Sequence, residues 1–123
     1  MMTDMERILD ALMCIRCSAV STEAQLHEQT QSALADAGIE AQHEVKLGAG
    51  ARIDFMALGV GIEIKKKRPE RAKLIMQLRR YAGYEEIKAL IVVAPKGVDL
   101  PGEICGKAIR CISLERLWGI GLP

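Results

Sequence analysis

Asp54, Glu63 and Lys65 are the residues of this sequence whose types and spacing can do chemistry. The positions that alternate with them are apolar: Ile53, Phe55, Ile62 and Ile64. Because alternate residues of a β-strand point to the same face, the pattern predicts that the three charged side chains share one face of an antiparallel hairpin and the apolar ones the other. Two carboxylates and an ammonium group on one face can hold a divalent cation beside a group that moves protons.

A hairpin turn centred on residues 59 and 60 predicts how the two strands pair. It places Asp54 opposite Lys65, with Glu63 one diagonal step away. Carboxylates this close repel each other unless a cation lies between them, and hard oxygen ligands favour Mg²⁺ or Mn²⁺, with the backbone carbonyl of Ile64 as a further ligand. Such a site suits phosphodiester hydrolysis, in which the attacking water loses a proton and negative charge grows on the phosphate. Lys65 would orient or deprotonate the water, or stabilise that charge.

The same three residues also fit the solvated face of an ordinary hairpin. Asp, Glu and Lys are common there, and cross-strand charge pairs are mildly stabilising. Asp is a poor strand former, however, and helices before and after the hairpin would cover this face. A covered charged trio is costly unless it has a function, so the pattern favours a site.

Helical and extended periodicities predict the elements that position these residues. The predicted helices cover residues 4–17, 21–37 and 69–84, with a short helical turn at 114–118, and the predicted strands cover 42–47, 52–58, 61–66, 89–94 and 108–114. The order is α, α, β, β, β, α, β, β, which predicts an α/β fold with a right-handed crossover where a helix joins two strands. A chain of 123 residues is long enough for one domain with a single core.

Asp54, followed on the next strand by Glu63, Ile64 and Lys65 and set between two helices, resembles the motif of the PD-(D/E)XK nuclease superfamily. The resemblance implies that Asp54 and Glu63 hold the metal and that Lys65 assists the water. The residue before Asp54 is Ile53 rather than proline, a change that the superfamily tolerates widely.

The resemblance covers about residues 21–94 and implies a restriction-endonuclease-like αβββαβ core, in which helices flank a central mixed sheet. Residues 4–17 and 108–118 are then additions to a single domain of residues 1–123. The implied activity is that of a Mg²⁺-dependent endonuclease acting on DNA, including branched DNA or the DNA of phages and mobile elements. The alternative is a non-catalytic module that uses the same fold to bind nucleic acid or protein.

Many members of the superfamily add an acid from the first core helix, and two candidates are present here. Glu23 lies on the same helical stripe as the apolar Leu26, whereas Glu28 lies roughly 200° around the helix from it. The sequence therefore favours Glu23 as the further metal ligand. An acid at the start of a helix also complements the helix dipole, which explains Glu23 equally well.

The helix that follows the motif resembles the superfamily's Q-x-x-x-Y helix, in which the glutamine, here Gln77, faces the site. Its basic residues, and those that follow Lys65, would bind the phosphate backbone without reading sequence. The residues predicted to contact nucleic acid are Lys66, Lys67, Arg68, Arg79, Arg80 and Tyr81. A solvated run of charge would have the same sequence.

The composition supplies the remaining expectations. The net charge is only +1, so the case for nucleic acid depends on where the basic residues cluster. The apolar runs are too short to cross a membrane and no export signal is visible, which predicts a cytoplasmic location. A small nuclease needs two sites to cut both strands, and the apolar N-terminal helix predicts a homodimer. The histidines, His27 and His43, receive no role.

The four cysteines are Cys14, Cys17, Cys105 and Cys111. They are most simply reduced thiols in a chain without an export signal. A four-thiolate zinc or iron–sulfur site that joins the two ends of the chain is the alternative.

Overall fold

The computed structural model describes residues 1–15 and 22–117. The helices are α1 (Asp4–Leu12), α2 (Glu23–Asp36), α3 (Arg71–Ala82) and α4 (Leu114–Leu117), and the strands are β1 (Gln42–Gly48), β2 (Ala51–Ala57), β3 (Val60–Ile64), β4 (Ala89–Ala94), β5 (Glu103–Ile104) and β6 (Lys107–Ser113). Every predicted element is present, and the two-residue β5 was not predicted. The first helix ends at Leu12, five residues before the predicted end at residue 17. Residue 17 and Trp118, the predicted ends of the first helix and of the last helical turn, lie outside the described residues.

The two N-terminal helices begin where their sequences provide caps. Thr3 and Glu6 form a capping box at the start of α1, and Thr22 and Gln25 form one at the start of α2. Each pair satisfies backbone N–H groups that have no partner within the helix. The second helix therefore begins at Glu23, directly after its N-cap Thr22 and two residues after the predicted start.

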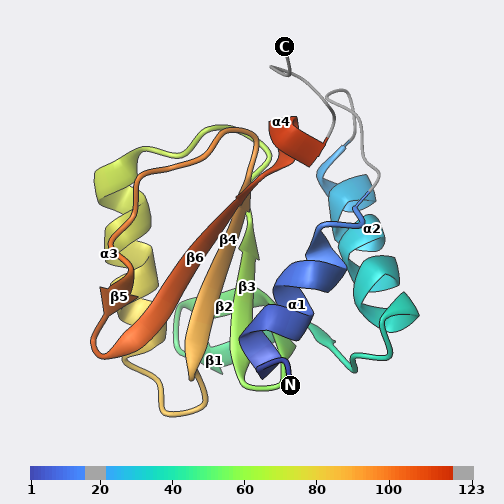
Figure 1. Cartoon of the computed structure of the whole chain (residues 1–123). Helices are drawn as coiled ribbons and strands as arrows, with labels where there is room; N and C mark the ends of the chain where they lie inside the picture. Colours follow the sequence, from blue (N-terminus) through green and yellow to red (C-terminus); the bar gives the residue numbers. More distant parts are fainter. Residues whose placement is uncertain (16–21, 118–123) are drawn as a thin grey trace.

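The strands form one mixed sheet in the order β1-β2-β3-β4-β6-β5. The β1–β2, β2–β3 and β5–β6 pairs are antiparallel, whereas β3–β4 and β4–β6 are parallel. Helices α1 and α2 cover one face of the sheet and α3, which connects β3 to β4, covers the other (Figure 1). The fold is therefore α/β, as predicted.

Two apolar clusters lie on opposite faces of this sheet. Ile8 and Leu12 of α1 pack with Leu26 and Leu34 of α2 on one face, and Leu78 of α3 packs on the other. Strand β4 is buried on both faces, which explains its unbroken apolar sequence. Because the apolar stripe of α1 packs inside this chain, it no longer supports the predicted homodimer. No helix of the described ranges is long and apolar enough to cross a membrane.

The β2–β3 hairpin differs in register from the prediction. Its turn residues are Leu58 and Gly59, with φ of 53° and 79°, which is the left-handed geometry of a tight two-residue hairpin turn. Phe55 pairs with Ile62, so the register continues to Asp54 beside Glu63. The predicted pairing of Asp54 with Lys65 is wrong by two residues because the turn lies one residue earlier than expected.

Candidate functional site

Asp54 lies where strand β2 stops alternating regularly. Ile53 packs in the cluster beneath α3, whereas Phe55 packs in the cluster beneath α1 and α2. The prediction that both residues share one apolar face is therefore wrong, since a regular strand would keep them on the same side. The break leaves the Asp54 carboxylate beside β3, where its Oδ2 accepts a hydrogen bond of 2.8 Å from the backbone N–H of Ile64.

Glu63 lies at the centre of the site. It is only 6 % exposed, and its Oε2 accepts hydrogen bonds of 3.2 Å from Lys65 Nζ and from Gln77 Nε2. Its Oε1 accepts a bond of 3.4 Å from the backbone N–H of Asp54. The hydroxyl of Tyr81 lies 3.4 Å from the same oxygen. Strands β2 and β3 and helix α3 thus bring four of the predicted site residues to one buried carboxylate.

The electrostatics of the site favour a cation. Burial raises the pKa of Glu63 above its ordinary value, the charge of Asp54 raises it further, and Lys65 opposes this. Burial also raises the pKa of Tyr81, as does the negative charge of Glu63. The positive charge of Lys65 therefore does not fully offset the negative charges of Asp54 and Glu63. A bound cation would reduce the free-energy cost of keeping both carboxylates ionised in this partly buried site.

The oxygen donors around Asp54 fit a hard divalent ion. The N–H of Ile64 donates to Asp54, and because the N–H and C=O of one residue in an extended strand point to the same side, we expect the Ile64 carbonyl on that side as well. Asp54, Glu63 and the Ile64 carbonyl can thus supply the oxygen ligands that Mg²⁺ or Mn²⁺ requires.

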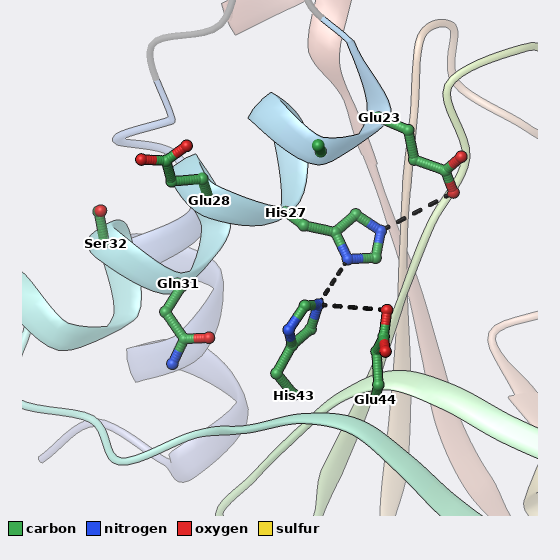
Figure 2. A pocket seen from close by; sticks show the side chains of 8 residues that line it. Glu23, His27, Glu28, Gln31, Ser32, His43 and Glu44 are labelled. Atoms are coloured by element: carbon green, nitrogen blue, oxygen red, sulfur yellow. Dashed lines mark hydrogen bonds and ion pairs between the residues drawn. The ribbon is translucent and has the colours of Figure 1, made fainter.

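The two acids predicted as alternatives on α2 are placed differently. Glu23 Oε1 lies 3.9 Å from His27 Nε2, and Asp54 Oδ2 lies 3.9 Å from the same nitrogen. In Figure 2, Glu28 points away from that imidazole while Glu23 points towards it. Of the two acids, Glu23 is the one on the side of Asp54.

Basic side chains line two hollows that meet at α3. Lys46 and Arg52 line one of about 310 Å³, and Lys65 and Lys73 line another of about 460 Å³, while Arg80 lines both. Gln77, which donates a hydrogen bond to Glu63, also lines both hollows, so each hollow extends to the candidate site. Lys66, Lys67, Arg68 and Arg79 are exposed.

Tyr81 does not belong with the nucleic-acid contacts predicted on this helix. It is 3 % exposed, and its hydroxyl donates a 2.8 Å hydrogen bond to the carbonyl of Arg52 while it accepts one of 3.0 Å from Gln77. Tyr81 therefore holds Gln77 against Glu63 and is not placed to contact a polymer. Tyr81 lies on the same helical stripe as the buried Leu74 and Leu78, but Tyr is common both in cores and at surfaces, so the sequence did not settle its burial.

The histidine pair is the feature that sequence analysis missed. His27 Nδ1 and His43 Nε2 lie 2.8 Å apart, at hydrogen-bond distance. The two residues come from α2 and β1, so only the packing of that helix on the sheet brings them together. Nothing in their spacing along the chain could have indicated the contact.

Among the described residues, the cysteines form no cluster of three or more possible metal ligands. Cys14 follows α1 on one face of the sheet, whereas Cys111 packs against the apolar cluster on the other face. Cys17 lies outside the described residues. Cys14 and Cys111 are thus not placed to share one metal ion.

No family model, curated protein or solved structure matches this chain.

Proposed function

We propose that this chain is a metal-dependent endonuclease that hydrolyses phosphodiester bonds in DNA. The observation that carries the proposal is the set of contacts at Glu63: a buried carboxylate with a raised pKa, beside Asp54 and hydrogen-bonded to Lys65 and Gln77. Burying this much charge is costly, and a catalytic role explains why the chain retains it.

The arrangement of the elements supports a restriction-endonuclease-like fold. From α2 to β4 the chain runs α, β, β, β, α, β, the order expected of the nuclease core. The first three strands are antiparallel neighbours and β4 joins β3 in parallel, so Asp54 and Glu63 lie side by side near the middle of the sheet. Helix α1 and strands β5 and β6 are additions to this core.

Asp54, Glu63 and the Ile64 carbonyl would hold the metal ion, with Glu23 as the candidate further acid. A bound Mg²⁺ or Mn²⁺ supplies a water of lowered pKa and neutralises charge on the phosphate. Lys65 Nζ lies 3.2 Å from Glu63 Oε2 and lines the larger basic hollow, so it can orient the attacking water there. Gln77 and Tyr81 keep the Glu63 carboxylate fixed for this task.

The basic residues support a polyanionic substrate. The two hollows with their shared Arg80 lie next to Gln77, and the exposed Lys66, Lys67 and Arg68 continue directly from the strand that carries Glu63. Contacts from such residues bind phosphates and set the position of the duplex. The chain as a whole carries only +1 charge, so this local basic surface is what would attract DNA.

Incubation of the protein with supercoiled, linear, single-stranded and four-way-junction DNA tests the proposal. We expect cleavage with Mg²⁺ or Mn²⁺, none with EDTA, and none by Asp54→Asn or Glu63→Gln. Glu28→Gln, purified in the same way, should cut like the wild-type protein. Wild-type cleavage by Asp54→Asn, or the absence of cleavage by the wild-type protein with any substrate, would end the proposal. DNA binding without cleavage would favour the non-catalytic module.

A further inference from the structure

A second cluster of possible metal ligands lies on the α2 side of the sheet. His27, His43 and Glu44 each place one ligand atom within 4.8 Å of the others. His43 Nε2 lies 2.8 Å from His27 Nδ1 and 4.0 Å from Glu44 Oε1. Figure 2 shows the two imidazoles facing each other with the Glu44 carboxylate beside them.

The backbone at Glu44 has an unusual conformation that makes this cluster. Neighbouring residues of a strand point to opposite faces, so His43 and Glu44 should not share a site. Glu44, however, has a φ of 53°, in the left-handed region that non-glycine residues rarely adopt. This conformation lets its carboxylate lie on the same pocket wall as His43. Strain at a non-glycine residue is commonly stored where a side chain is held for a function.

The imidazoles are held firmly by their surroundings. The His43 ring stacks on Phe55 with ring centres 4.6 Å apart and an angle of 20° between the planes, and the His27 ring packs against the same phenyl ring at 5.6 Å. Phe55 is fully buried. Both histidines therefore approach the cluster with little freedom to turn away, as preorganised ligands do.

The far nitrogen of His27 provides an independent indication. His27 Nε2 is buried and has no hydrogen-bond partner among the described residues, although Glu23 Oε1 and Asp54 Oδ2 each lie 3.9 Å from it. When an imidazole binds a metal through Nδ1, its proton lies on Nε2, and a carboxylate usually faces that proton. The surroundings of His27 have this arrangement.

We propose that His27 Nδ1, His43 Nε2 and Glu44 bind a divalent transition metal such as Zn²⁺, at a site separate from the Asp54–Glu63 centre. Two imidazoles and one carboxylate suit zinc, whereas Mg²⁺ prefers oxygen ligands alone. Nitrogen ligands of a tetrahedral zinc are roughly 3.3 Å apart, so the 2.8 Å pair opens by only a few tenths of an ångström to admit the ion. Three protein ligands leave one position open towards a pocket of about 620 Å³.

Zinc titration of tag-free protein, followed by NMR of the imidazole rings, tests the site directly. The chain has only two histidines, so two sets of ring signals are expected, and the set lost in His43→Ala identifies His43. We expect Zn²⁺ to shift both signals and to saturate at one equivalent, and Mg²⁺ to leave the His43 signal unchanged, because its proposed ligands Asp54 and Glu23 adjoin only His27. Zinc that perturbs neither ring would overturn the proposal.

Calorimetry with zinc and two variants supplies the quantitative test. His43→Ala, with a side chain that is 40 % exposed and so tolerant of replacement, should weaken zinc binding at least tenfold. Glu28→Gln, on the wall of the same pocket, should bind zinc like the wild-type protein. Unchanged binding by His43→Ala would place the zinc away from this cluster and overturn the proposal. Neither measurement depends on DNA cleavage.

Discussion

Asp54→Asn is expected to abolish DNA cleavage while making the folded protein more stable. The asparagine carbonyl can still accept the hydrogen bond from the Ile64 N–H, so the backbone geometry is kept. The substitution removes a charged metal ligand and, with it, one of the two causes that raise the pKa of Glu63. Activity and stability should therefore change in opposite directions, as expected for a site that retains unfavourable charge for a function.

The size and the pH dependence of the gain follow from Glu63. Its folded-state pKa lies above the ordinary value of 4.5, so the folded protein holds this proton more tightly than the unfolded chain. The resulting stabilisation is present below pH 4.5 and is lost as the pH rises through the folded-state pKa. Asp54→Asn should therefore be more stable than the wild-type protein at neutral pH, by about 1.4 kcal/mol for each pKa unit that the charge of Asp54 adds to Glu63. For a chain of this length, each kcal/mol gained raises Tm by about 4 °C.

Thermal unfolding in EDTA between pH 4 and pH 8 measures this gain. The advantage of Asp54→Asn should grow with pH, and Asp36→Asn, which removes an exposed acid on α2, should not show this growth. Mg²⁺ at ten times its dissociation constant should stabilise the wild-type protein by about 1.4 kcal/mol but stabilise Asp54→Asn far less. A lower Tm for Asp54→Asn at neutral pH, or an equal response of both proteins to Mg²⁺, would refute the reasoning.

Three further sets of substitutions test the surroundings of the site. Gly61→Ala should lower Tm by roughly 4–12 °C, as measured by circular dichroism during heating. The added methyl group would overlap side chains of β2 and β4, and overpacking of this kind costs about 1–3 kcal/mol. Glu23→Gln should reduce DNA cleavage by orders of magnitude or raise the Mg²⁺ concentration that cleavage requires. Glu28→Gln should cleave like the wild-type protein. The reverse result would show that Glu28 is the metal-binding acid of this helix. Lys65→Met should lower kcat with little change in DNA affinity, whereas Lys67→Ala should weaken binding and reduce its dependence on salt.

Local patterns were sufficient to predict every element of the fold except the two-residue β5. Apolar runs and caps locate helices and strands because these signals act within a few residues, and the unbroken apolar sequence of β4 reflects burial on both faces. The register of the hairpin was not predictable in the same way. A turn that begins at Leu58 needs a left-handed backbone at a residue that rarely adopts it, so the sequence favoured a turn one residue later.

The sequence predicted which residues of β2, β3 and α3 belong to the candidate site, but it did not predict the contacts that depend on how these elements pack. Glu63 and Gln77 are brought together by the crossover of α3, and the resemblance to a nuclease motif was needed to expect that contact. The burial of Tyr81 and the pairing of His27 with His43 depend on how helices pack on the sheet. Contacts of this kind join residues that are far apart in the chain, so the spacing of those residues along the sequence does not predict them.

One irregularity in the β1–β2 ladder links the two proposed metal sites. His43 pairs with Phe55 and Val45 with Ile53, so the left-handed Glu44 lies level with Asp54. At this level β2 stops alternating, which turns Asp54 towards β3, and β1 turns Glu44 towards His43. An irregular ladder costs stability, and bulges and breaks of this type are retained where they re-aim functional side chains. The same local distortion would thus serve both proposed sites, the oxygen site on one side of β2 and the imidazole site on the other, with His27 between Asp54 and Glu44.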